Sequence, residues 1–120
     1  MRLASYTLLI LGAVTVKVLA KPVQKLTLQQ LDELAQKNGK IMVEWNVAAC
    51  TNCDRVRAEF ASHGDLQDIV FVSLDYDVIF PDHTDQFNTY QATIGHDVKG
   101  TYQGVDDKQV ADLLQNLAAA

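Results

Sequence analysis

The feature that most constrains this chain is a pair of cysteines, Cys50 and Cys53, set between an apolar run and a stretch with helical spacing. The apolar run covers residues 41–47, and the chain has no other cysteine. Two cysteines with this spacing at the start of a helix lie on one face of its first turn, where they can close a small disulfide ring. Unpaired backbone N–H groups and the helix dipole favour the thiolate of the first cysteine. The stretch therefore predicts a buried strand, a redox-capable pair and a helix, in that order.

The first twenty of the 120 residues have the pattern of an export signal. Arg2 supplies a positive start, residues 3–16 are apolar, and small or aliphatic residues precede Lys21. We expect residues 1–20 to be a signal peptide, either cleaved or kept as an N-terminal anchor, and the protein to be exported, either periplasmic or secreted. Residues 21–120 then have the length of one small domain.

The charge and the cysteine spacing narrow the function further. A formal net charge of −5 argues against nucleic acid as a partner. In an oxidising compartment a cysteine pair forms a disulfide. However, a ring that encloses only two residues adds little stability by loop entropy, so structural need alone does not explain the pair.

Apolar periodicity and capping residues predict an α/β domain. Thr27 and Gln30 form a capping box that starts a helix. Buried strands are expected at 40–47 and 69–74, a helix from Cys50, strands at 88–94 and 98–105 joined by a turn, and a final helix capped by Asp106. This order predicts a mixed central sheet with helices on both faces. The cysteine pair would lie at the carboxyl end of the first buried strand.

Residues 43–53, Val-Glu-Trp-Asn-Val-Ala-Ala-Cys-Thr-Asn-Cys, resemble the redox segment of the thioredoxin family. The resemblance covers about residues 26 to 117. It places Glu44 at the family's acidic position, six residues before the first cysteine, and Gly104 at the glycine of the last strand. It implies a thioredoxin-like three-layer α/β sandwich and the activity of an exported thiol:disulfide oxidoreductase.

Three positions depart from the family pattern, and they concern substrate docking and redox poise. Ala49 stands where the family usually has tryptophan. The family's cis-proline, where the backbone receives substrate peptide, has no counterpart, and its position falls near Asn88 or near Gly95. The lysine that often neighbours the buried acid on the next strand is replaced by Ser73.

The expected catalytic residues are Cys50, Cys53 and Glu44. Cys50 attacks a substrate disulfide as the thiolate, and Cys53 resolves the mixed disulfide. Burial in an apolar strand would raise the proton affinity of the Glu44 carboxylate, which could then accept the proton of Cys53 directly or through a water molecule. The alternative is that Glu44 points to solvent at the sheet edge.

The expected partners are protein thiols and disulfides, together with a membrane redox protein that recharges the pair. We expect a monomer with no cofactor beyond its own redox-active Cys50–Cys53 disulfide.

Two other functions remain open at this point. The chain could be a non-enzymatic thioredoxin-like binding module whose cysteine pair is vestigial or serves one dedicated partner. It could also be a metallochaperone that binds Cu(I) through both thiolates. We expect no zinc site, because no second pair of cysteines or histidines completes four ligands. His63, His83 and His96 stand in turn-like sequence and are expected to be solvated, as are the aspartates between residues 75 and 85.

Overall fold

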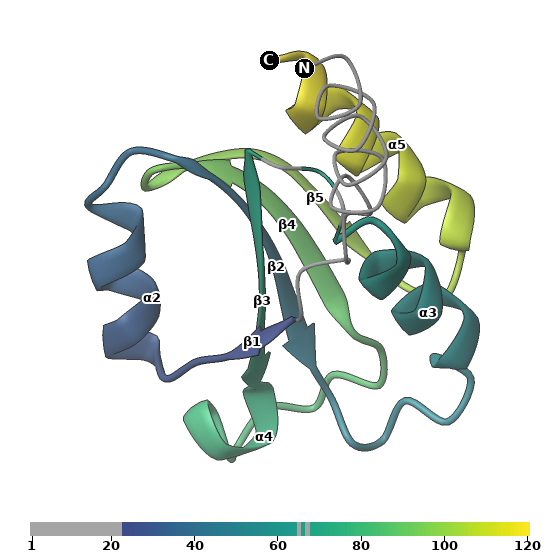
Figure 1. Ribbon diagram of the computed structural model, residues 1–120. Helices are drawn as coiled ribbons and strands as arrows, with labels where there is room; N and C mark the ends of the chain where they lie inside the picture. The colour runs from purple at the N-terminus through teal and green to yellow at the C-terminus, as the bar shows by residue number, and fades with distance from the viewer. Residues whose placement is uncertain (1–22, 65, 67) are drawn as a thin grey trace, which may run out of the picture.

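The computed structural model describes residues 23–64, 66 and 68–120, and Figure 1 shows their arrangement. The elements in chain order are β1 (Gln24–Lys25), α2 (Leu28–Ala35), β2 (Lys40–Asn46), α3 (Asp54–Ser62), β3 (Ile69–Asp75), α4 (Tyr76–Ile79), β4 (Thr89–Ile94), β5 (Asp97–Gln103) and α5 (Asp107–Ala119). The expected signal segment, residues 1–20, lies outside the described residues. Within the described part, no helix combines the length and the apolar character that a membrane span requires.

The five strands form one mixed sheet in the order β1-β3-β2-β4-β5. β1, β3 and β2 run parallel, whereas β4 is antiparallel to both β2 and β5. β2 is therefore the central strand, with a neighbour on each side. Its Glu44 pairs in register with Ser73 of β3 and with Tyr90 of β4.

Helices cover both faces of the sheet, as the sequence predicts, and make a three-layer sandwich (Figure 1). Side chains alternate between the two faces of a strand, so Ile41 and Val43 face α2 while Met42 and Glu44 face the opposite layer. That opposite layer is formed by α3 and α5. Its buried residues recur with helical spacing at Val56, Phe60, Val110, Leu114 and Leu117.

Local sequence signals decide several element ends. The capping box of α2 is present, with Thr27 and Gln30 bonded reciprocally, and the Asp106 side chain caps α5 by accepting from the Lys108 N–H. The turn between β4 and β5 contains Gly95 at a φ of 59°, a value that glycine adopts without strain. Two short elements, β1 and α4, were not expected, because two and four residues are too few to show a period.

Candidate functional site

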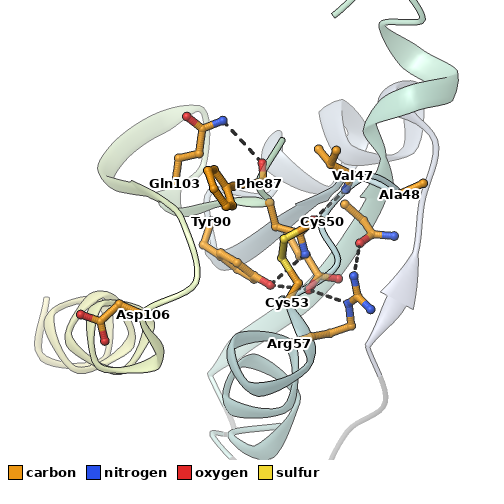
Figure 2. Close-up of a disulfide and its surroundings, with 12 residues drawn as sticks. Val47, Ala48, Cys50, Cys53, Arg57, Phe87, Tyr90, Gln103 and Asp106 are labelled. Atoms are coloured by element: carbon orange, nitrogen blue, oxygen red, sulfur yellow. Dashed lines mark hydrogen bonds and ion pairs between the residues drawn. A yellow bond between two sulfur atoms is a disulfide. The ribbon is translucent and has the colours of Figure 1, made fainter. Parts of the chain in front are cut away.

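The two cysteines form a disulfide in the loop that follows β2, with their Cα atoms 5.6 Å apart. This loop leaves the carboxyl end of the central strand, where the sequence places it. It turns back at once, since the Cys50 N–H donates to the Val47 carbonyl at 3.1 Å. Figure 2 shows the disulfide with the side chains around it.

The helix that follows the cysteine pair begins later than predicted. α3 starts at Asp54 and Cys53 is its N-cap, so Cys50 precedes the helix and does not lie in its first turn. The Arg57 N–H bonds to the Cys53 carbonyl at 2.8 Å. Thr51 and Asn52 instead lie in an exposed turn, where a short polar side chain such as that of asparagine competes well with helical bonding. The prediction of a helix from Cys50 is therefore wrong by one turn.

The two sulfur-bearing residues differ in access. Cys50 keeps 8% of its surface exposed, whereas Cys53 is fully buried. Both cysteines belong to the core layer that includes Val56 and Phe60 of α3. Cys50, the expected nucleophile, is therefore the more accessible residue of the two.

The Glu44 side chain is buried between the sheet and α3, with 4% of the residue's surface exposed. Each carboxylate oxygen has a donor: the Ser73 hydroxyl lies 2.9 Å from Oε1, and the Tyr90 hydroxyl lies 2.8 Å from Oε2. The alternative of a solvent-facing glutamate at the sheet edge is wrong, because β2 is the central strand. The catalytic role of Glu44 stays a prediction.

The positive charge near Glu44 comes from α3. The Arg57 Nε lies 3.9 Å from Oε2 of Glu44, and the Arg57 guanidinium also donates to Asn46 Oδ1 at 2.7 Å. Ser73 stands where the resemblance places a lysine, so the cation is supplied by the helix and not by the next strand. The sequence signal for this was the spacing: Arg57 lies one helical turn after Cys53.

A solvent cleft of about 310 Å³ reaches this carboxylate from the side of β1 and α3. Its polar lining consists of Lys25, Glu44, Asn46, Arg57 and Ser73. Glu44 therefore lines a cleft that solvent can enter, and Thr51 and Asn52 of the exposed turn are not part of that lining.

Asn88 directly precedes β4 and joins the loop after β2 to the core. Its Oδ1 accepts from the Val47 N–H at 2.7 Å, and its Nδ2 donates to the Tyr90 hydroxyl at 3.2 Å. Gly95 lies at the other end of β4, bonded to Gly39. Of the two candidates for the missing proline position, Asn88 is thus the one beside the redox loop. Its neighbour Phe87, 45% exposed, is part of the disulfide surroundings in Figure 2.

Tyr90 links these groups and is fully buried. Burial raises the pKa of the Tyr90 phenol well above its ordinary value, and the charge of Glu44 raises it further. The phenol therefore stays protonated and acts as a hydrogen-bond donor. Tyr90 was not expected in the site from the sequence, and Asn88 was expected there only as one of two candidates for the missing proline position.

A second polar group braces the loop from α4. Asp77 Oδ2 accepts from the Ala48 N–H at 2.9 Å, and Asp77 Oδ1 lies 2.5 Å from Nε2 of His83. The Ala48 N–H, followed by His83, lowers the pKa of Asp77. The prediction that His83 is solvated is wrong: only 11% of its side chain is exposed, because it packs against Tyr76 and pairs with Asp77. His96 and His63 are more exposed, at 57% and 36%.

The described residues contain no group of three or more histidine, cysteine, aspartate or glutamate side chains that could hold a metal ion. The pair of sulfur atoms in the disulfide is the reactive chemistry that the described site offers. In the reduced state it would present two thiols, of which that of Cys50 belongs to the residue with the larger exposed fraction.

Comparison with known proteins identifies the fold. No protein-family model matches the chain, and no curated protein sequence matches it. Among solved structures, thioredoxin from Plasmodium falciparum superposes with a TM-score of 0.66 at 18% identity, covering 78% of this chain and 98% of that one. Thioredoxin f from spinach chloroplast gives 0.66 at 13% identity, covering 82% and 88% of the two chains.

Thioredoxin from Trypanosoma brucei brucei gives a TM-score of 0.69 at 11% identity, covering 88% of this chain and 98% of that one. These similarities extend over almost the whole length of each thioredoxin. The predicted thioredoxin-like sandwich is therefore confirmed as the fold of this chain.

Proposed function

We propose that this protein is a thiol:disulfide oxidoreductase that exchanges disulfides with protein substrates through Cys50 and Cys53. The observation that carries the proposal is the unequal access of the two cysteines, 8% exposed against 0%, within one disulfide at the carboxyl end of a central strand. Exchange needs one sulfur that a substrate can reach and a second one held behind it. The thioredoxin-like fold and a buried carboxylate on the same face of the sheet support this assignment.

In the reducing direction the thiolate of Cys50 attacks one sulfur of a substrate disulfide. A bond forms between Cys50 and that sulfur, and the other substrate sulfur leaves with the bonding electron pair. Cys53 then loses its proton to Glu44 and attacks the Cys50 sulfur. The substrate leaves as a dithiol and the Cys50–Cys53 disulfide remains. In the oxidising direction the same steps run in reverse.

Continued turnover requires a second redox protein to restore the starting state of the pair. We assign that role to a membrane protein and the site of action to an exported compartment, following the signal-like pattern of residues 1–20. The protein would work as a monomer, and its only redox group would be its own disulfide.

The activity is tested by disulfide reduction of insulin with the purified protein and a small dithiol. Wild-type protein should accelerate the reduction, and Cys50→Ser should abolish the acceleration, because no thiolate can then start the exchange. Cys53→Ser should instead accumulate mixed disulfides with partner proteins, because the resolving thiol is missing. A wild-type protein that does not accelerate reduction, together with an empty Cys53→Ser trap, would contradict the proposal.

A binding module for one dedicated partner is the second candidate. Asn88 favours it, because the residue at the substrate-docking position turns its side chain inward to Val47 and Tyr90. In that case Cys53→Ser would trap a single partner while insulin would not be reduced.

A further inference from the structure

A directed chain of hydrogen bonds runs from the redox loop to Glu44, and Figure 2 labels two of its members, Val47 and Tyr90. The Val47 N–H donates to Asn88 Oδ1 at 2.7 Å, Asn88 Nδ2 donates to the Tyr90 oxygen at 3.2 Å, and the Tyr90 hydroxyl donates to Glu44 Oε2 at 2.8 Å. Every donor points the same way. The chain therefore ends on an oxygen that must accept, and hydrogen bonds of this kind favour the ionised carboxylate.

The two oxygens of Glu44 are held differently. Oε2 accepts from Tyr90 and has Arg57 Nε at 3.9 Å, whereas Oε1 accepts from the Ser73 hydroxyl at 2.9 Å. A hydroxyl can turn and accept in place of donating. Tyr90 cannot do so without a new acceptor for its own proton, because the Asn88 amide already donates to its oxygen. A proton can therefore be received at Oε1 while the chain on Oε2 stays intact.

We infer that Tyr90, held by Asn88, is a positioning residue that occupies Oε2 of Glu44 and leaves Oε1 to receive the proton released by Cys53, directly or through water of the cleft. The inference rests on the proposed function, because the resolving step of exchange is what releases that proton. In that step the Cys53 proton moves to Oε1 of Glu44, and the freed sulfur electron pair forms the bond to Cys50. The substrate sulfur leaves with the electrons of the broken bond.

Charge and burial around Glu44 agree with this role. The titratable and polar groups that face the carboxylate or the cleft leading to it are Arg57 of α3, Lys25 of β1, Ser73 of β3 and Tyr90 of β4. The raised pKa of Tyr90 keeps it a donor throughout the range in which cysteine thiols titrate, around pH 8.5. Tyr90 alone among these groups also bonds to Asn88 beside the redox loop, within the described residues.

Tyr90→Phe tests the inference, with Tyr102→Phe as the matched control. The two tyrosines pair in register on β4 and β5, but the Tyr102 oxygen accepts from the Asp106 N–H at 2.8 Å and does not contact Glu44. In reduced protein, the Glu44 carboxyl is followed by carbon-13 NMR across pH. Tyr90→Phe should move its titration midpoint up by about one pH unit, a tenfold gain in proton affinity, and Tyr102→Phe should leave it in place.

Two further measurements complete the test. In single-turnover disulfide reduction, the acidic limb of the pH profile should move upward with the carboxyl midpoint for Tyr90→Phe only. In wild-type protein, the NMR signal of the Tyr90 ring carbon that bears the oxygen should change with pH together with that of the Glu44 carboxyl. This measurement does not depend on whether a variant folds.

The outcomes separate this inference from the proposed function. The positioning role would be overturned if the Glu44 carboxyl had the same pH midpoint in Tyr90→Phe and Tyr102→Phe. It would also be overturned if the NMR signal of Tyr90 did not change as the Glu44 carboxyl titrates, even in a protein that reduces insulin. If the midpoint shifted only in Tyr90→Phe but the protein reduced no disulfide, the proposed function would be overturned. The effect of Tyr90 on the Glu44 carboxyl would still be supported.

Discussion

Asp77 shows how one side chain can fix the backbone that carries the cysteines. It accepts the Ala48 N–H two residues before Cys50 and pairs with His83. Because Ala48 and His83 lower the Asp77 pKa below its ordinary 3.8, the folded state releases this proton more readily than the unfolded state. The contribution of Asp77 to stability is therefore present above about pH 4 and is lost as the pH falls through the lowered value.

The lowered pKa of Asp77 gives a prediction for stability in acid. Between pH 5 and pH 3, the melting temperature of the wild type should fall further than that of Asp77→Asn, which has no carboxylate to protonate. Asp82→Asn, in an exposed position of the same segment, is the control and should keep the wild-type pH dependence. Thermal unfolding followed by circular dichroism at both pH values measures this. An acid loss of equal size in the wild type and Asp77→Asn would contradict the role given to Asp77.

At the residue scale, the sequence was informative about groups that are neighbours along the chain. Cys50, Cys53 and Glu44 lie within ten residues of one another, and their spacing alone places them together. Tyr90 reaches Glu44 across 46 positions of sequence. It reads locally as an ordinary strand residue, so its role required the pairing of β2 with β4.

At the scale of elements, capping residues at helix starts carry measurable free energy. The Thr27 side chain accepts from the Gln30 N–H at 3.2 Å at the start of α2. Thr27→Ala should lower the free energy of unfolding by about 1 kcal/mol, because one N–H of the first turn loses its partner. Urea denaturation at constant m-value measures the change. Thr27→Ser retains the hydroxyl and should unfold close to the wild-type midpoint; a loss as large as that of alanine would refute a capping role.

Elements with a clear period or cap were predicted well, and short elements were not. The two apolar strands, the capped helices and the β4–β5 hairpin all appear near the expected residues. The helix after the cysteines begins late because the turn at Thr51 and Asn52 intervenes. Asparagine favours such a turn, but it does not fix the residue at which the helix begins. α4 forms a single turn in which Tyr76 packs against Trp45 of β2, with ring centroids 5.9 Å apart, a contact between residues 31 positions apart that local sequence does not reveal.

At the scale of the whole molecule, the layers on the two faces of the sheet contain different kinds of side chain. The layer under α2 packs apolar side chains such as Val43 and Leu74. The layer under α3 and α5 contains both cysteines and Tyr90 within the same core cluster, and Glu44 lies on that face. The packing that stabilises the fold on this face therefore also holds the candidate site in place.

Phe60 is the side chain that makes this coupling testable. It is buried on α3, and its ring centroid lies 5.5 Å from that of Phe71 and 5.5 Å from that of Tyr90. Phe60→Ala would leave a cavity between the helix and the sheet, and it should lower the free energy of unfolding by about 3–5 kcal/mol. That is a large part of the roughly 5–15 kcal/mol that stabilises a typical domain.

Phe80→Ala is the matched control for Phe60→Ala. Phe80 is 45% exposed and packs mainly against Tyr76, so its removal should lower the free energy of unfolding by less than about 1.5 kcal/mol. Urea denaturation measures both losses on one scale. Because the cavity adjoins Tyr90, Phe60→Ala should also broaden the NMR signal of the Tyr90 ring, whereas Phe80→Ala should not. Equal losses from the two variants would mean that the layer beneath α3 is not the one that holds this fold together.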